Sequence, residues 1–557
     1  MRLKPLILVS TLLCQGLVST GVAGPALLQS PADASGIGPG QQMENPPRWY
    51  DDAVIYQIWV RAFAGGADHD GVGNLSGIQD RLDYLQSLGV NTLWLSPIFQ
   101  CAYHGPNMHG YDTTDYYALN ELFGTGADLK RLIDAVHARG MRILFDFVPN
   151  HTSTSHPWFT GVHQKSWYVW KQDLPDGWGL PWGGGGSEDV WKEMDGSYFY
   201  TAFGTGSLAD LNYDNPEVRR AMQDVERYWL DRGFDGMRVD AARYLCETGP
   251  HKAADQPATH ARLREFRAVL DEYQQGGNHP HPAGDPAKVS TKMMMAEAWS
   301  FDATGVGPYY GNGSDEFNLC LDFSCPPAIS ETLKTPDATR ITRLWEYERD
   351  HYPAGFRTAS FDSNHDNLIS RPGTQYGGNR NQIILAEALN LLSPGTPVIY
   401  YGNEVGMTGK RGEDLDLRQP MDWAAVTAQT PQPDSILNWC KYLIKARGAY
   451  PALRGGYATL ATDLGPAKAL AYVRDAGAER VVVVANLTSA AETVTITDLT
   501  RHGVAAGGTV HTIIGGTGNN ETLNGTRLAV TELPPYGIRV IYAAGGAFKG
   551  PIHGDRQ

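Results

Sequence analysis

The stretch Leu129-Lys-Arg-Leu-Ile-Asp-Ala-Val-His-Ala-Arg-Gly140-Met-Arg-Ile-Leu-Phe-Asp-Phe-Val148 carries the repeating unit of the fold. Its first part has apolar residues at helical spacing, which predicts an amphipathic helix that ends at Gly140. The short run Ile143–Val148 is then rich in aromatic and branched residues and predicts a strand. A helix that leads directly into a strand is the building block of an α/β fold.

The same alternation extends in both directions from this stretch, starting at about Asp51. Eight strand runs that alternate with helices predict a parallel (β/α)8 TIM barrel. An open doubly wound sheet is the alternative, but no glycine-rich phosphate loop follows the first run. The eight runs are Val54–Val60, Thr92–Ser96, Ile143–Val148, Gly236–Val239, Met293–Ala296, Asn318–Phe323, Arg357–Ser360 and Val398–Tyr401.

Two departures from the alternation predict further domains. A long stretch rich in glycine and tryptophan follows the third strand run, which predicts an inserted subdomain over residues 152–212 whose tryptophans mostly form its own core. After about Pro451, strands follow one another at short spacing, which predicts an antiparallel β-sandwich over residues 451–545. The barrel domain is expected to span residues 48–450, and a tail to occupy residues 546–557.

The N-terminus has the pattern of a secretory signal peptide over residues 1–24. Arg2 and Lys4 precede the apolar run Leu6–Val18, and small residues follow at Gly21–Gly24. The apolar run is too short to span a membrane. We therefore expect an exported protein, periplasmic or secreted, with a flexible leader at residues 25–47; a buried N-terminal helix is the alternative.

Composition narrows the range of partners. A formal net charge of −15 argues against a nucleic-acid partner, because few cations are left to neutralise phosphates. Cys320 and Cys325 lie close enough in sequence to form a disulfide in an oxidising compartment. No Cys-x-x-Cys pair or histidine-rich cluster occurs, so a zinc site is not supported.

Four of the expected strands end in carboxylate or histidine residues. In a (β/α)8 barrel these ends meet at one rim, where reactive residues lie. Burying several carboxylates together is costly unless function requires it, so their convergence indicates a catalytic site. The segments are Asp146-Phe-Val-Pro-Asn150-His151, Gly236-Met-Arg238-Val-Asp240-Ala241, Met295-Ala-Glu297-Ala-Trp299 and Ser360-Phe-Asp-Ser-Asn364-His365-Asp366.

In order and wording, these segments resemble the four signature regions of glycoside hydrolase family 13, the α-amylase family. The resemblance covers about Asp51 to Trp423. It implies a retaining glycosidase that acts on α-linked gluco-oligosaccharides or starch-derived maltodextrins through a covalent glycosyl-enzyme intermediate, without an organic cofactor. Flanking matches are Gly89-Val-Asn-Thr-Leu-Trp-Leu-Ser-Pro97, Asp210-Leu-Asn-Tyr-Asp-Asn215 and Gly395-Thr-Pro-Val-Ile-Tyr-Tyr-Gly402.

The resemblance also implies roles for the rim carboxylates. Retaining cleavage needs a nucleophilic carboxylate and a carboxylic acid about 5–5.5 Å apart. Asp240 matches the nucleophile, and we expect Arg238 to keep it ionised. Glu297 matches the general acid/base, with a pKa raised by neighbouring carboxylates. Asp366 matches the third catalytic carboxylate, which grips hydroxyls of the distorted sugar.

Further matches concern substrate binding. His151 and His365 match histidines that hydrogen-bond the same sugar ring, and Tyr111 matches the aromatic platform beneath it. Asp112 and Arg418 resemble an Asp–Arg pair that closes the pocket behind the terminal glucose in oligosaccharide-acting members, which favours short substrates. A surface ion pair unrelated to substrate is the alternative.

The linkage and the fate of the glucosyl unit are less constrained. Ala241, after the nucleophile, resembles members that prefer α-1,4 links. A glucosyltransferase or isomerase such as a trehalose synthase uses the same intermediate and stays open as an alternative. A non-catalytic, family-like binding protein is a third reading, but such proteins lack the full catalytic set that this chain carries.

Calcium is the one cofactor that the resemblance suggests. The segment Asp68-His-Asp70-Gly-Val72-Gly-Asn74 resembles a calcium-binding loop of α-glucosidase-like members, and oxygen ligands at alternate positions suit Ca²⁺. Gly66 stands where a further carboxylate is common, so a metal-free turn is the alternative. A second family calcium site, at Asn150, is put in doubt because Arg243-Tyr244 replaces the usual Lys-His.

Overall fold

The computed structural model describes most of the chain from Trp49 onward. The described residues are 49–65, 72–105, 108–274, 292–300, 302–313, 315–366, 368–454, 459–460, 465, 467–516, 520–544, 548–549 and 551–554. The predicted signal peptide and leader lie outside these residues, as do Asp68 and Asp70 of the predicted calcium loop.

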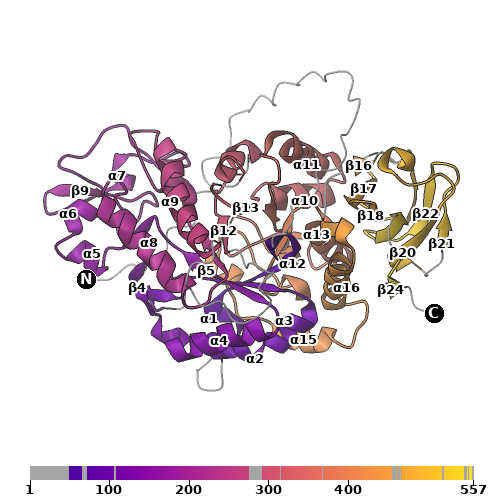
Figure 1. Ribbon diagram of the computed structural model, residues 1–557, viewed down its shortest axis with the longest axis horizontal. Coiled ribbons are helices and arrows are strands. Elements are labelled where there is room, and N and C mark those ends of the chain that lie inside the picture. Colours follow the sequence, from indigo (N-terminus) through magenta and orange to yellow (C-terminus); the bar gives the residue numbers. More distant parts are fainter. Residues whose placement is uncertain are drawn as a thin grey trace.

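Eight parallel strands close into a barrel, which confirms the predicted (β/α)8 fold (Figure 1). Each strand pairs with the next barrel strand in the sequence, and the last returns to the first with Ile55 opposite Val398. Each expected strand run coincides with one of them: β1 (Ile55–Ile58), β2 (Thr92–Leu95), β5 (Arg142–Phe147), β11 (Gly236–Val239), β12 (Met293–Ala296), β13 (Leu319–Leu321), β14 (Thr358–Ser360) and β15 (Thr396–Tyr400).

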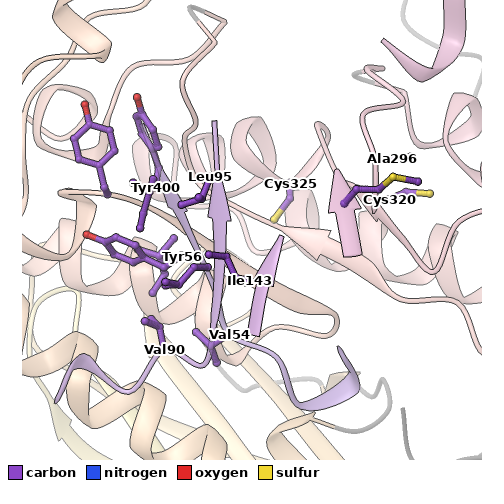
Figure 2. Close-up of a cluster of buried hydrophobic side chains, with 14 of the residues drawn as sticks. Val54, Tyr56, Val90, Leu95, Ile143, Ala296, Cys320, Cys325 and Tyr400 are labelled. Atoms are coloured by element: carbon purple, nitrogen blue, oxygen red, sulfur yellow. The ribbon is translucent and has the colours of Figure 1, made fainter. Parts of the chain in front are cut away.

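Apolar side chains fill both faces of the barrel wall. Trp94, Leu144 and Met295 belong to a cluster of buried residues contributed by several barrel strands. Side chains of the opposite face pack against the surrounding helices, and Figure 2 shows Tyr56 and Ile143 in that second cluster. Burial on both faces is typical of parallel strands and holds their C-terminal ends in fixed relative positions.

The helices begin and end where sequence signals predict. In α4 (Gly126–Ala138), Thr125 and Asp128 form a capping box, and α8 (Pro216–Leu230) starts with proline after the Asn215 cap. The helix expected over Leu75–Gly89 is divided at Arg81 into α2 (Leu75–Asp80) and α3 (Leu82–Leu88). The other long helices are α9 (Pro257–Gln274), α10 (Cys325–Lys334), α11 (Thr339–His351), α13 (Arg380–Leu392) and α16 (Ile436–Ala449).

The inserted subdomain follows β5, the third strand of the barrel. It contains an antiparallel pair, β6 (His151–Ser153) with β10 (Leu208–Asp210), and a three-stranded sheet. Trp178 and Trp191 are buried in a separate apolar cluster, with Trp182 packed against it, whereas Trp167 is buried in the large core that the barrel shares. The expectation that most tryptophans of the insertion form its own core therefore holds for half of them. The three strands of its sheet are β7 (Trp170–Lys171), β9 (Ser197–Tyr200) and β8 (Trp191–Met194).

The C-terminal strands form the predicted antiparallel sandwich, at the end of the molecule opposite the insertion (Figure 1). Its two sheets enclose an apolar core of their own. Arg474, on the larger sheet, donates to the carbonyl of Leu392 and so fastens the sandwich to the end of α13. The larger sheet contains β16 (Thr459–Leu460), β17 (Ala469–Ala476), β18 (Glu479–Asn486), β23 (Ile538–Ala544), β20 (Thr509–Gly516), β21 (Asn520–Thr522) and β24 (His553–Gly554); the smaller pairs β19 (Glu492–Ile496) with β22 (Leu528–Leu533).

The possible disulfide between Cys320 and Cys325 is not formed. Both cysteines are free and buried. Cys320 lies on β13, whereas Cys325 starts α10 beyond the turn that follows the strand, and Figure 2 shows their sulfur atoms apart. In the part of the chain that the structure describes, no helix is both long and apolar enough to cross a membrane.

Candidate active site

The predicted catalytic residues converge at the C-terminal rim of the barrel. Asp240 directly follows β11 and Glu297 directly follows β12, while Asp366 lies in the loop after β14. Asp240 is 7% exposed, so its carboxylate is buried yet open to the rim. Because β11 and β12 are neighbours in the barrel wall and β14 lies two strands beyond β12, residues far apart in the sequence meet at one rim.

Arg238 lies at the centre of the site and contacts three carboxylates. Its Nη1 donates to Asp146 at 2.6 Å and to Asp240 at 2.8 Å. Its Nη2 lies 2.9 Å from Glu297. The side chain is only 1% exposed, so all three contacts are shielded from water. One guanidinium therefore holds both candidate catalytic carboxylates in fixed positions, as the planar fork of arginine allows.

A backbone amide adds a further contact to Glu297. Ala241 has left-handed backbone angles, with φ 51° and ψ 32°. Its N–H donates to Oε2 of Glu297 at 2.9 Å. A residue other than glycine costs about 1 kcal/mol or more in this region, and such strain is typical of functional sites. The turn after the nucleophile thereby orients the acid.

The two carboxyl groups have different pKa values. Burial raises the pKa of Asp240 to about 7, with Asp146 and Asp366 adding to the rise. Burial raises the pKa of Glu297 to about 8, and the nearby Asp240 and Asp366 add to it as expected. Arg238 lowers both pKa values and so favours the ionised form of Asp240, as expected, but burial outweighs it. The raised pKa of Glu297 suits a proton donor.

Tyr111 and His365 form one wall of the site. Their rings stack with centroids 5.8 Å apart, and the Tyr111 hydroxyl lies 2.8 Å from His365 Nε2. The Gln57 side-chain amide lies 2.6 Å from His365 Nδ1, so the two ring nitrogens of His365 are held from opposite sides, by Gln57 and by Tyr111. Burial lowers the pKa of His365 to about 3, so the imidazole is neutral.

His151 is placed to bind a ligand. It is buried, and burial lowers its pKa to about 3. Its Nδ1 lies 3.3 Å from the Asn150 amide, whereas its Nε2 has no hydrogen-bond partner among the described residues. A buried polar atom left unpaired calls for an explanation. A substrate hydroxyl would satisfy it.

The predicted ion pair between Asp112 and Arg418 is absent. Asp112 is buried and accepts the backbone N–H of Tyr103 at 2.9 Å. Arg418 instead lies 3.6 Å from Asp414, and its Nε donates to the carbonyl of His365. Asp112 is therefore held within its own loop, with no hydrogen-bond partner for its Oδ1 among the described residues, whereas Arg418 contacts its own loop and the loop after β14. This corrects the expectation that the two close the pocket together.

Three positioning residues were missing from the predicted set. Asp146 accepts from Arg238 and also from the Trp94 indole at 3.1 Å. Trp59 lies between the His365 ring, at 5.1 Å, and the Arg418 guanidinium, at 4.6 Å. Gln57 holds Nδ1 of His365 in place. Asp146 stands in the quoted signature segment and could have been found there, whereas nothing in the sequence marks Gln57 or Trp59.

Aromatic residues of the insertion cover the side of the site next to Glu297. Phe203 packs edge-on against His151 with centroids 5.2 Å apart. Trp182 lies 5.8 Å from Phe203 and 6.5 Å from Trp299, two residues after Glu297. The inserted subdomain thus forms part of the active site.

The described residues contain no group of three or more histidine, cysteine, aspartate or glutamate side chains suited to a metal ion. Asn74 caps α2, and its side-chain oxygen accepts from Gly77 N–H and from the Ser76 hydroxyl, so it is occupied without a metal. The Asn150 amide donates to Asp210 at 3.1 Å. Calcium at Asp68, Asp70, Val72 and Asn74 stays a prediction.

Comparison with known proteins adds independent evidence. A family model described as "Alpha amylase, catalytic domain" matches residues 57–456. "Alpha-amylase 3" of Dictyoglomus thermophilum is 29% identical, over 79% of this chain and 85% of its own length. "Trehalose synthase/amylase TreS" of Mycobacterium tuberculosis is 31% identical, over 79% of this chain and 82% of its own. The crystal structure of the α-amylase from H. orenii, 28% identical, covers 88% of this chain and 99% of its own with a TM-score of 0.72.

Proposed function

The chain belongs to glycoside hydrolase family 13, the α-amylase family of enzymes that act on α-glucans, and we propose that it hydrolyses α-1,4-linked glucans with retention at the anomeric carbon. The observation that carries this proposal is the Arg238 guanidinium held between Asp240 and Glu297. It holds two buried carboxyl groups beside each other at the rim, and retaining cleavage needs such a close pair of a nucleophile and an acid.

In the first step, Asp240 attacks the anomeric carbon while Glu297 gives its proton to the departing glycosidic oxygen. The glucosyl unit becomes esterified to Asp240, and the leaving sugar takes up the proton. In the second step, Glu297, now a carboxylate, takes a proton from water, and the water oxygen displaces Asp240. Arg238 stabilises the carboxylate charge in both steps, and the enzyme returns to its starting protonation state.

Substrate contacts follow from the walls of the site. His151 Nε2 and the Asp366 carboxylate are placed to hydrogen-bond sugar hydroxyls, and the Tyr111 ring provides an apolar face for the sugar. Ala241 supports a preference for α-1,4 links. The missing Asp112–Arg418 contact removes the structural argument for short substrates, so chain length is left to experiment.

Glucosyl transfer is the second candidate activity. The relative named "Trehalose synthase/amylase TreS" is 31% identical to this chain over most of both lengths. Transfer and hydrolysis share the glucosyl-Asp240 intermediate and differ in the acceptor, which is a sugar in one and water in the other. Export by the signal-peptide-like residues 1–24 would supply external glucans and favours hydrolysis.

The experiment is to incubate the purified protein with maltose, maltotriose, isomaltose, starch and pullulan and to separate the products. Release of glucose or maltose from α-1,4-linked substrates, with little from isomaltose, is the expected result. Accumulation of new disaccharides or longer chains would favour transfer. A protein that changes none of these substrates would refute the proposed function.

A further inference from the structure

Arg243 joins the two loops that carry the candidate catalytic residues, and the proposed mechanism does not use it. It lies in η3 (Ala242–Tyr244), three residues after Asp240. Its Nε donates to one carboxylate oxygen of Asp255 at 2.8 Å, and its Nη2 donates to the other at 2.5 Å. Its Nη1 donates to the backbone carbonyl of Trp299, in the loop after β12. One guanidinium therefore fastens the loop after the nucleophile to the loop after the acid.

Asp255 is held in position for this contact. The Tyr309 hydroxyl, from η5 (Gly307–Tyr310), donates to its Oδ1 at 2.6 Å, and the backbone N–H of Asp255 donates to the carbonyl of Arg243 at 3.1 Å. The backbone of Asp255 is in the left-handed region, with φ 58°. Such a conformation costs stability at a residue other than glycine, and it persists at functional sites where neighbouring contacts enforce it.

Stability alone does not account for the ion pair between Arg243 and Asp255. The Asp255 side chain is 41% exposed and the Arg243 side chain is 17% exposed. Ion pairs that reach the solvent add little to the free energy of unfolding, because water screens them and the side chains lose conformational freedom. A strained backbone that presents a solvent-exposed carboxylate to one arginine therefore indicates a role in placing the two loops.

The two loops carry half of a group of four aromatic side chains, here called the rim aromatic cluster: Trp182, Phe203, Tyr244 and Trp299. The ring of Trp182, in the insertion, has its centroid 6.5 Å from that of Trp299 and 6.1 Å from that of Tyr244. The ring of Phe203, also in the insertion, lies 5.9 Å from Tyr244. Trp182, Phe203 and Trp299 are partly exposed, so a ligand can reach them. Arg243 joins the loops that supply Tyr244 and Trp299 and so fixes the shape of the cluster.

The rim aromatic cluster lies on the side of the site where the departing sugar must be. In the proposed mechanism Glu297 protonates the departing glycosidic oxygen, so the sugar attached to that oxygen lies beside Glu297. Trp299 follows Glu297 by two residues, and Trp182 packs against Trp299. The retained glucosyl ring has a separate aromatic face, at Tyr111. Aromatic rings offer large apolar faces on which the apolar face of a second sugar ring can pack.

We propose that Arg243 and Asp255 are positioning residues for the sugar on the leaving side: their ion pair places Tyr244 and Trp299 so that the rim aromatic cluster binds that sugar. The ligand is a neutral glucosyl or oligoglucosyl unit whose ring packs on the aromatic side chains. This inference rests on the proposed function, because it concerns the leaving half of the same substrate.

An ion pair of the same geometry elsewhere in the chain supplies a matched control. Arg227 of α8 donates to Glu272 of α9 from Nε at 2.9 Å and from Nη2 at 2.6 Å. The two side chains are 32% and 44% exposed. Each helix of a (β/α)8 barrel starts near the rim and runs back to the opposite end, and both residues lie near the C-terminal ends of their helices. Glu272→Gln thus weakens a similar ion pair away from the site.

The test measures kcat/KM of Asp255→Asn, Arg243→Lys and Glu272→Gln on the α-1,4-linked oligosaccharide that the wild type cleaves best and on α-glucosyl fluoride, with thermal unfolding of the same samples. Asparagine also tolerates the left-handed conformation, so Asp255→Asn keeps the backbone. We expect Asp255→Asn and Arg243→Lys to lose about tenfold or more on the oligosaccharide, the result of a misplaced binding surface. On the fluoride, which leaves without a sugar, both should stay within about twofold of the wild type.

The double variant of Arg243→Lys and Asp255→Asn should lose no more than the more impaired single variant, because both changes remove the same contact. Equal losses on the oligosaccharide and on the fluoride would overturn the inference, because they would show a general disturbance of the site. So would an unchanged kcat/KM of Asp255→Asn on the oligosaccharide, or the same loss in Glu272→Gln. A wild type that cleaves no α-1,4-linked substrate would instead refute the proposed function.

Discussion

Replacing Arg238 tests how far this residue lowers the pKa values of the two catalytic carboxyl groups. Arg238 Nη1 donates to Asp146 and Asp240, and its Nη2 forms an ion pair with Glu297. A lysine has one nitrogen and cannot reach all three oxygens. Removing one partner from a buried ion pair costs about 3–5 kcal/mol when the remaining charge stays uncompensated. Here the carboxylates can take up protons instead, so part of the cost appears as higher pKa values.

The direction in which the pH profile moves follows from the role of Asp240 as nucleophile. Arg238 lowers the pKa of Asp240, which is about 7 in its presence, so the pKa must rise in Arg238→Lys and further in Arg238→Met. Asp240 has to be ionised to attack, so the acidic limb of the kcat/KM profile moves to higher pH. A rise of about two units would leave roughly 1% of Asp240 ionised at pH 7, a loss of about 50-fold before any misplacement.

The assay is the pH dependence of kcat/KM for Arg238→Lys and Arg238→Met, with thermal unfolding measured on the same samples. Arg243→Lys is the control, since Arg243 lies on the same loop but pairs with Asp255 at 2.5 Å rather than with the catalytic carboxylates. We expect a displaced acidic limb only in the Arg238 variants. An unchanged limb in a folded Arg238→Met protein would refute the electrostatic account.

Three further outcomes are expected. The pH profile of wild-type kcat/KM should be bell-shaped, with its maximum between the pKa values of about 7 for Asp240 and about 8 for Glu297. Glu297→Gln should abolish the alkaline limb of this profile. The variant should also keep far more activity on substrates with an aryl or fluoride leaving group than on substrates with a sugar leaving group. His151→Ala should raise KM and lower kcat/KM by about tenfold without lowering the melting temperature, which steady-state kinetics and calorimetry can show. Glu226 is buried without a hydrogen-bond partner among the described residues, and burial raises its pKa. A raised carboxyl pKa lowers the free energy of unfolding only at pH values above the pKa of the same group in the unfolded chain. Glu226→Met should therefore stabilise the protein by about 1–3 kcal/mol at pH 8 and by less at pH 4, as measured by urea unfolding.

The barrel could be predicted because the sequence signals of its strands are short, local and repeated along the chain. Each buried strand is a short apolar run, and the rim residues come directly after those runs, as Asp240 and Glu297 show. The predicted Asp112–Arg418 contact failed for the opposite reason. It depended on the relative placement of two loops, and each side chain found a partner within its own loop, the Tyr103 amide for one and Asp414 for the other.

Residues that position the catalytic or substrate-binding side chains were also not predicted. Gln57 and Trp59 touch His365 from a strand far away in the sequence, so only the closed barrel brings them together. The contribution of burial to the pKa of Asp240 could not be predicted, because burial depends on the whole fold.

The most direct test of the central claim is to identify the residue that carries the glycosyl group. A 5-fluoro-α-glucosyl fluoride forms the intermediate faster than it is hydrolysed, so the intermediate accumulates and can be found by mass spectrometry of the digested protein. The mechanism predicts one added fluoroglucosyl group, on the peptide that contains Asp240, and none in Asp240→Asn. A label on any other residue, or rapid turnover of the substrate without a covalent adduct, would contradict the assignment of Asp240 as nucleophile.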